Sequence, residues 1–327
     1  MSPNNVDVVT VGESLVLFQS LTNRPLQYET SMMKSLGGAE SNVAIVLSRL
    51  GKKARWISRV GEDPHGDYVL ATLAGEGVDV SQVIRDKEAP TAIYFKDFKG
   101  YGDPSVYYYR HDSAASKLHP EDIQEEWLQG AKHLHVTGIT PALGESPEET
   151  VRQIMTSARE KGMTISFDPN LRRKLWGEEQ ARRVLLSLIP LCDIFLPGLD
   201  EAEFLLGKLP TEEYGKRFIE MGANVVVLKL GERGAIAFSQ NHSIQVSPYK
   251  VDHVVDTVGA GDAFAAGFLS SVLDSGNFLG SEASLKQALQ RANILGALAT
   301  QFKGDWEGTP TLEEVNNLLK GEQSLTR

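Results

Sequence analysis

The chain has 327 residues, 41% of them hydrophobic and 23% charged, which is the composition of an ordinary globular protein with a well-buried core. Its net charge of −10 argues against a surface for nucleic acid or anionic membranes, although a local basic pocket stays compatible with it. The single cysteine, Cys192, cannot form an internal disulfide, no apolar run is long enough to span a bilayer, and no signal-peptide pattern opens the sequence, so we expect a cytoplasmic protein.

Strand-like runs alternate with amphipathic helical stretches along most of the chain. We expect strands at 6–12, 54–61, 133–138, 163–170, 193–198 and 224–231, and helices at 41–51, 66–78 and near 147–161, 178–189 and 211–221. This alternation predicts an α/β fold with a central, mostly parallel β-sheet flanked by helices. Ligands of such sheets bind beyond the carboxyl ends of the strands.

Two segments, 14–35 and 89–111, break this rhythm because they are rich in aromatic and β-branched residues. The second contains a turn signal, KGYGDPS, between two strand-like runs. We interpret both as strands of a small accessory β-sheet, suited to be a lid and a dimer surface. No linker or repeat divides the chain, so a single domain over residues 1–327 is expected.

The stretch DTVGAGDAF, residues 256–264, places two glycines before an Ala-rich helical segment. Gly259 and Gly261 allow a sharp turn with exposed N–H groups, and the helix start adds partial positive charge, which together suit a phosphate. Asp262 could cap the helix or could accept a proton from a substrate hydroxyl. The spacing alone leaves both roles open.

A second glycine cluster, LGGAESNVAIVLSRLG, begins at Leu36. Gly37 and Gly38 could bring the backbone close to a small ligand, and Asn42 adds an amide. The alternative is a plain turn entering a helix, with Glu40 or Ser41 near the cap.

Two arginines follow strand-like runs and could converge on one pocket. Arg110 follows YYY, and Arg172 follows FDPNL. Guanidinium groups bind carboxylates and phosphates through paired hydrogen bonds, so the two would suit an acidic substrate, although single arginines are more often surface residues. His133 and His135 lack the companions that a metal site needs.

With these residues in view, the chain resembles the ribokinase-like (PfkB) family of carbohydrate kinases over essentially its whole length. Two signatures carry the resemblance, GGAESNVAIVLSRLGKKARWISRVGEDPHGD and DTVGAGDAFAAGF. The resemblance implies an ATP- and Mg²⁺-dependent kinase in which Asp262 is the catalytic base. It also implies that the backbone amides of Gly259, Ala260 and Gly261 form an anion hole.

Within the family, the segments YYRHDSAAS and DPNLRRKLW look most like those of 2-keto-3-deoxygluconate kinases. Arg110 and Arg172 would then hold the sugar-acid carboxylate with Tyr109 nearby. Tyr94, Gly37 and Gly38 would line the rest of the pocket. A fructokinase, a ribokinase and a non-catalytic sugar-acid sensor stay as alternatives, as does the galactonate-derived epimer of the substrate.

The resemblance also suggests residues for the nucleotide and for metal ions. It implies nucleotide contacts from the segment KLGERG, through Lys229, Gly231 and Gly234, and from the segment RANILGALAT, through Asn293 and Gly296. The family motif N-x-x-E reads GLDE here and leaves Glu201 for Mg²⁺. Asp256 and the loop around Gly304 are expected for a monovalent cation such as K⁺. We expect a homodimer through the lid or a higher homo-oligomer.

Overall fold

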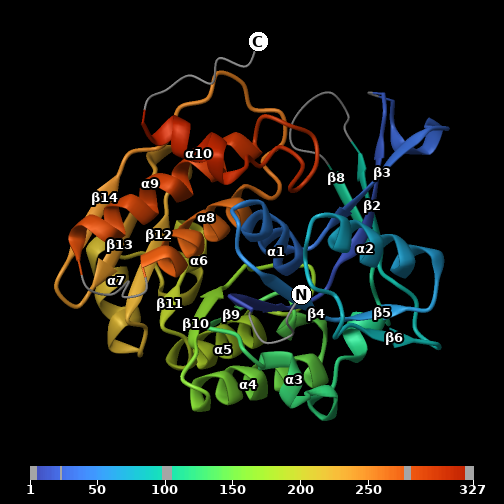
Figure 1. Cartoon of the computed structure of the whole chain (residues 1–327), viewed down its shortest axis with the longest axis horizontal. Helices are drawn as coiled ribbons and strands as arrows, with labels where there is room; N and C mark the ends of the chain where they lie inside the picture. Colours follow the sequence, from blue (N-terminus) through green and yellow to red (C-terminus); the bar gives the residue numbers. More distant parts are fainter. Residues whose placement is uncertain (1–5, 23, 98–104, 276–280, 321–327) are drawn as a thin grey trace.

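The computed structural model describes residues 6–22, 24–97, 105–275 and 281–320. Its centre is an eight-stranded sheet in the order β14-β13-β12-β11-β10-β9-β1-β4 (Figure 1). All neighbouring strands from β12 to β4 run parallel, whereas β13 and β14 are antiparallel additions at one edge. The strands of this sheet are β1 (Val8–Val11), β4 (Ala54–Ile57), β9 (His133–Thr137), β10 (Thr164–Asp168), β11 (Ile194–Phe195), β12 (Val225–Lys229), β13 (Ala235–Ser239) and β14 (Ser243–Val246). The predicted α/β fold with a mostly parallel sheet is confirmed.

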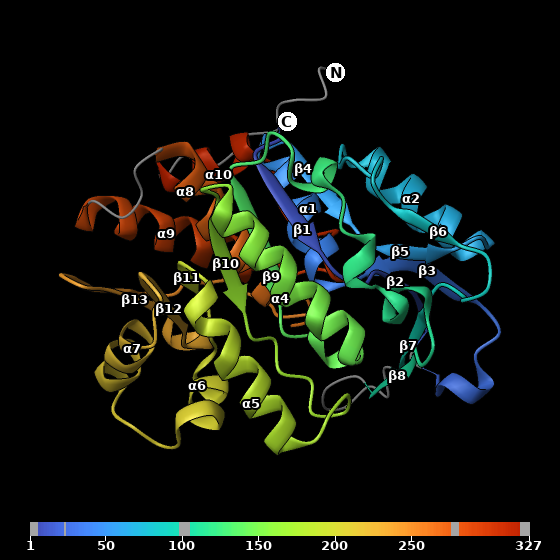
Figure 2. The same ribbon diagram turned by 90° about the horizontal axis from the view of Figure 1, so that it is seen from below.

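Helices cover both faces of this sheet (Figure 2). One face carries α1 (Ala39–Arg49), α2 (Pro64–Gly75), α8 (Ala260–Ser275), α9 (Glu282–Ala299) and α10 (Leu312–Leu319). The other face carries α3 (Glu125–Leu128), α4 (Glu145–Glu160), α5 (Glu178–Leu188), α6 (Leu199–Leu206) and α7 (Thr211–Glu220). Within the part of the chain that the structure describes, no helix is both long and apolar enough to cross a membrane.

The core is divided by the period-two alternation of the strands. In β12, Val225 and Val227 face the α8–α9 layer, whereas Val226 and Leu228 face the layer of α4 to α7. The face of β9 and β10 that lies towards α1 and α8 is polar instead. His133 and His135 lie there, fully buried, and each forms a hydrogen bond of 2.7–2.8 Å with the hydroxyl of Ser166.

A four-stranded sheet in the order β3-β2-β7-β8 stands beside the main sheet. Its strands are β2 (Leu15–Ser20), β3 (Met32–Gly37), β7 (Ile93–Asp97) and β8 (Ser105–Tyr109), and they come from the two aromatic-rich segments. The expected turn KGYGDPS falls almost entirely outside the described residues. We call this small sheet the lid.

Three local details differ from the expectations. The run 54–61 forms two strands, because Ser58 separates β4 from β5 (Arg59–Gly61), and β5 pairs with β6 (Ile84–Asp86). Helix α1 begins at Ala39, so Glu40 and Ser41 lie within its first turn rather than capping it. The antiparallel strands β13 and β14 were not expected from the sequence.

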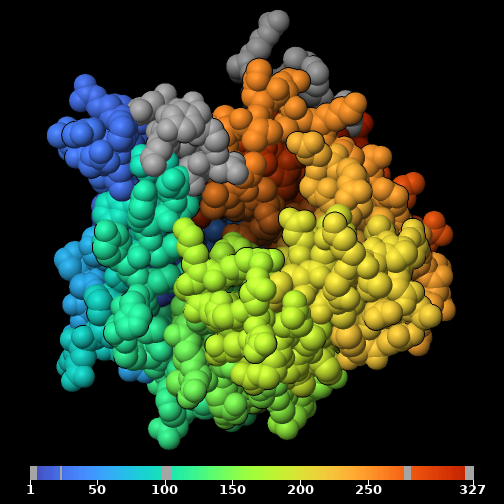
Figure 3. Space-filling view, turned by 180° about the vertical axis from the view of Figure 1, so that it is seen from behind, coloured from blue at the N-terminus to red at the C-terminus, as the bar shows by residue number. Residues whose placement is uncertain are grey.

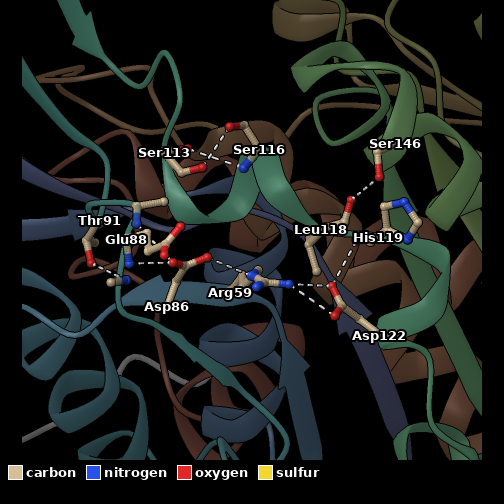
Figure 4. Close-up of polar contacts among 12 residues, drawn as sticks. Arg59, Asp86, Glu88, Thr91, Ser113, Ser116, Leu118, His119, Asp122 and Ser146 are labelled. Carbon is tan, nitrogen blue, oxygen red and sulfur yellow. Dashed lines mark hydrogen bonds and ion pairs between the residues drawn. The ribbon is translucent and has the colours of Figure 1, made fainter.

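Arg59 fastens the two connections that lead into and out of the β7–β8 hairpin (Figure 4). Its guanidinium donates to Asp86, which precedes β7, at 2.9 Å, and to Asp122, which follows β8, at 2.8 Å. Asp86 in turn accepts the backbone N–H groups of Glu88 and Ala89. The base of the hairpin is therefore fixed on β5.

Candidate active site

Two cavities meet at the end of the main sheet. The first, of about 320 Å³, lies between the inner face of the lid and the core, and the second, of about 360 Å³, lies between β12 and α9. Thr257 and Gly261 line both of them. Figure 3 shows the surface hollowed here, between a teal segment around β8, a yellow-green segment after β10 and an orange segment before α8.

The turn 256–259 separates the two cavities and leads into α8. Gly259 has φ 83°, and a Cβ at this position would lie 1.9 Å from the carbonyl oxygen of Asp305, so only glycine fits. The N–H groups in the first turn of α8, including that of Gly261, have no acceptor within the helix. The Ala260 N–H is bonded to the Thr257 carbonyl at 3.3 Å, so Gly259 and Gly261 are left as the better donors for an anion.

Asp262 is buried in the first turn of α8 and faces the first cavity. One of its carboxylate oxygens accepts a hydrogen bond of 2.8 Å from the side-chain amide of Asn42 on α1. Burial raises the pKa of Asp262 to about 7, although the Asn42 hydrogen bond and the charge of Arg172 act to lower it. A carboxyl group with this pKa can accept a proton near neutral pH.

The lid presents alternate side chains to the first cavity. Tyr94, Tyr108 and Arg110 line the cavity, and the rings of Tyr94 and Tyr108 stack at 5.6 Å. Tyr109, expected beside the carboxylate, is turned away: it is 65% exposed and packs edge-on against Phe95. The reason is the two-residue period of β8, which brings Tyr108 to the cavity together with Arg110.

Both arginines line this cavity, Arg110 directly after β8 of the lid and Arg172 after β10 of the main sheet. Arg110 is buried and forms an ion pair with Glu13, whose carboxylate also accepts the Ser113 hydroxyl at 2.5 Å. Arg172 is exposed, and its guanidinium donates to the side-chain oxygen of Asn170 at 3.1 Å. Within the described residues Arg172 forms no ion pair with a carboxylate.

Gly37 and Gly38 form the floor of the cavity where β3 meets α1. A Cβ at Gly37 would lie 2.0 Å from the Tyr94 hydroxyl oxygen, and one at Gly38 would lie 2.3 Å from the Glu13 carbonyl oxygen. Side chains at either position would therefore displace groups that line the cavity.

The second cavity brings together the residues expected at the nucleotide, which are Lys229, Gly231, Gly234, Asn293 and Gly296. Lys229 lies at the border with the first cavity: a Cβ at Gly261 would lie 3.9 Å from its Nζ. Its ammonium pairs with Asp168 at 2.6 Å. Burial disfavours the charge, yet Asp168 and Glu201 raise the pKa of Lys229, so it stays protonated.

The two candidate metal ligands already have partners. Glu201 accepts the backbone N–H groups of Leu171 at 2.8 Å and Gly198 at 2.7 Å. Asp256 is fully buried and receives the Lys96 ammonium at 3.0 Å. Among the described residues, no three His, Cys, Asp or Glu side chains gather as a ready-made metal cage.

Sequence reasoning missed several residues of the first cavity: Glu13, Lys96, Tyr108, Asn170 and Asp305. Tyr108 and Lys96 could have been found from strand alternation, since each lies two residues from an expected site residue. Glu13 and Asp305 come from loops far away in the sequence, and no local pattern marks them. Asn170 has φ 38°, which suits asparagine at the end of β10.

Comparison with known proteins identifies the family of the chain. Residues 5–312 match the model of the pfkB family of carbohydrate kinases. The chain is 41% identical to the 2-dehydro-3-deoxygluconokinase of Bacillus subtilis (strain 168) over 98% of this chain and 97% of that protein.

Two solved structures extend the comparison. A putative ribokinase II from E. coli, in complex with ATP and Mg²⁺, matches with TM-score 0.86 and 29% identity over 97% of this chain and all of that one. A fructokinase double mutant from Vibrio cholerae O395, with fructose, ADP and a potassium ion bound, matches with TM-score 0.85 and 29% identity over 97% and 99% of the two chains. The chain therefore belongs to the pfkB family of carbohydrate kinases and is an ATP-dependent sugar kinase.

Proposed function

We propose that this enzyme phosphorylates the terminal hydroxyl of 2-keto-3-deoxygluconate. The observation that carries the proposal is that Arg110 and Arg172 line the same cavity as Asp262. Arg172 has no carboxylate partner within the described chain, so a sugar acid would supply the missing anion. The name of the Bacillus subtilis relative supports the same substrate.

In the proposed mechanism the residues around Gly261 position two substrates in line. Asp262 accepts the proton of the terminal hydroxyl, whose oxygen forms a bond to the γ-phosphorus of ATP while the bond from that phosphorus to the bridging oxygen breaks. The N–H groups of Gly259 and Gly261 and the Lys229 ammonium stabilise the charge on the transferred group. Asp262 then returns its proton to solvent or to the product phosphate.

Mg²⁺ and ATP are the cofactors that we propose. The two carboxylates beside Lys229, a residue that lines the second cavity, fit Mg²⁺, because this ion is usually bound by one or two carboxylates, waters and substrate phosphates rather than by a full protein cage. Glu201 and Asp168 would hold it, and it would neutralise phosphate charge when bound. Asp256 as a ligand for K⁺ stays a prediction.

We also propose that residues 1–327 act as one kinase domain with the small sheet as its lid, and that two lids pair in a homodimer. The support for pairing is the outer lid face, where Tyr107 and Tyr109 are exposed beside Phe95. Sedimentation velocity tests this. Tyr107→Ser with Tyr109→Ser should give monomers, whereas Phe302→Ser, at an exposed site outside the lid, should not. An unchanged dimer in the lid variant would refute the pairing.

A fructokinase activity is the second candidate, and one observation favours it. Arg110 already pairs with Glu13, so its charge is balanced before any substrate binds. A neutral sugar would then meet only Arg172, at the exposed side of the cavity. This reading agrees with the fructose-bound relative.

A coupled ADP-release assay with Mg-ATP separates the candidates. The substrates are 2-keto-3-deoxygluconate, 2-keto-3-deoxygalactonate, gluconate, fructose and ribose. We expect kcat/KM for the keto-deoxy acids to exceed that for the neutral sugars by at least about tenfold, as one charged contact can supply. A preference for fructose or ribose would refute the substrate assignment and leave the kinase chemistry intact.

Arginine variants locate the carboxylate in the same assay. Arg172→Ala should raise KM for the sugar acid by about tenfold or more and change KM for fructose little. The matched control is Arg173→Ala, since Arg173 is a neighbouring exposed arginine that pairs with Glu178 and lies outside the first cavity. Equal effects of the two substitutions would contradict a role of Arg172 in binding the acid.

A further inference from the structure

Lys96 on β7 is a fully buried lysine at the inner face of the lid. Its ammonium lies 3.0 Å from a carboxylate oxygen of Asp256 and 2.6 Å from one of Asp305. A buried ammonium is costly unless it is paired and hydrogen-bonded. Burial lowers the pKa of Lys96, but Asp305 and Asp256 outweigh that effect and raise it, so the group is charged.

Both partners of Lys96 shape the turn that we propose as the anion hole. The second oxygen of Asp256 accepts the N–H of Val258 at 3.1 Å, inside the turn. The backbone of Asp305 packs against Gly259 so closely that no Cβ would fit between them. The other carboxylate oxygen of Asp305 accepts the hydroxyl of Tyr94, also on β7, at 2.9 Å. Lys96 therefore joins the lid to the two segments that fix this turn.

This arrangement does not fit the expectation that Asp256 binds a monovalent cation from solution. A hard cation such as K⁺ would need carboxylate and carbonyl oxygens facing a free space, and the ammonium of Lys96 faces these carboxylates instead. We propose that the Lys96 ammonium acts as a built-in cation that positions the phosphoryl-binding turn, so that turnover needs no added monovalent cation. Lys96 is thus a positioning residue, and this inference rests on the proposed role of the turn.

The first arm of the test uses the unmodified protein. Turnover is measured with KCl and with tetramethylammonium chloride at equal ionic strength, because the large organic cation cannot enter a site made for an ammonium or K⁺. We expect rates that agree within about twofold, since the fixed charge is already present. A rate at least about fivefold higher in KCl would overturn the inference.

The second arm compares two substitutions of different volume. Lys96→Ala removes the charge and opens a space, whereas Lys96→Met removes the charge but fills the space. Both should lower kcat by about a hundredfold, the loss typical of a missing charge-stabilising group. KCl or ammonium chloride should restore much of the rate of the Ala variant but not that of the Met variant. Unchanged kcat in both, or a loss in both without cation rescue of the Ala variant, would overturn the inference.

A readout without turnover separates this inference from the proposed function. The melting temperature of Lys96→Ala should rise in KCl relative to tetramethylammonium chloride, and that of the unmodified protein should not. Lys34→Ala is the matched control, because Lys34 is an exposed lid lysine that packs on the Tyr68 ring and should give no cation dependence. If no sugar is phosphorylated, the proposed function fails, and the melting data still decide the inference. If neither Lys96 variant folds, the comparison of salts on the unmodified protein decides it.

Discussion

Replacing Asn42 with leucine removes the hydrogen bond to Asp262 while keeping a side chain of similar size. This bond of 2.8 Å stabilises the charged carboxylate and so lowers its pKa. A hydrogen bond to a charged group contributes about 1.5–3 kcal/mol, and one pKa unit corresponds to about 1.4 kcal/mol. The pKa of Asp262 should therefore rise by about 1–2 units from its value of about 7.

The consequence for catalysis depends on pH. At pH 7 the ionised fraction of Asp262 should fall from about one half to between about 1% and 10%, so kcat/KM should fall by about 5- to 50-fold. At a pH well above the new pKa the base is ionised in both proteins, and the difference should shrink. The measurement is kcat/KM for the sugar from pH 5 to 10, since its acid limb reports the free enzyme.

Asn293→Leu is the control for this profile. It removes the same amide group, which donates to the Ser247 carbonyl at 2.9 Å in the second cavity, away from Asp262. Its acid limb should coincide with that of the unmodified enzyme. If Asn42→Leu lowers kcat/KM equally at every pH, Asn42 does not tune the base, and the reasoning from the hydrogen bond is refuted.

Three further predictions concern the charges buried around the site. Asp262→Asn should abolish most turnover. Because folding raises the pKa of Asp262 from 3.8 to about 7, the substitution should also increase the free energy of unfolding by about 4 kcal/mol at pH 8, and this gain should vanish below pH 4. Urea unfolding that shows no gain in stability at pH 8 would contradict this. Burial lowers the pKa of His133 and His135 from 6.5 to about 3. The free energy of unfolding should therefore fall by about 1.4 kcal/mol per pH unit for each histidine as the pH falls from 6.5 towards 3. His133→Gln should roughly halve this slope in acid unfolding. Lys229→Met should weaken ADP binding by about tenfold in calorimetry. It should also destabilise the fold by about 3 kcal/mol, because the carboxylate of Asp168 is left buried without its ion-pair partner. Unchanged ADP affinity would exclude Lys229 from the nucleotide site.

Much of the fold could be predicted because hydrophobic periodicity sets the layers. The runs around β1, β9, β10 and β12 alternate with amphipathic helices, and the parallel order follows from that alternation. The split after Ile57 and the strands β13 and β14 could not be predicted. Pairing of β5 with β6, and of β14 with β13, depends on partners that are distant or weakly patterned.

The candidate site was predictable wherever a local motif carries its chemistry. The turn before α8 and the two arginines are examples, because glycine spacing and guanidinium groups have meaning without tertiary structure. The expectation for Tyr109 rested on its closeness to Arg110 in sequence, whereas strand alternation brings Tyr108 to the cavity. The buried Lys96 could not be assigned a role, since its two carboxylates come from residues 160 and 209 positions away.

The anchoring of the hairpin by Arg59 divides the enzyme into parts that can change separately during evolution. Tyr94 and Tyr108 of the β7–β8 hairpin, and Arg110 directly after it, line the first cavity, which we propose as the sugar site, whereas Asp262 and the second cavity belong to the core. Substitutions in the hairpin can therefore alter which sugar is accepted, and they should leave the phosphoryl-transfer machinery undisturbed as long as Lys96 and its contacts with Asp256 and Asp305 are kept. Relatives with the same fold but different sugar substrates are the expected outcome. If the segment between residues 86 and 122 is exchanged between two such relatives, the sugar preference should move with it.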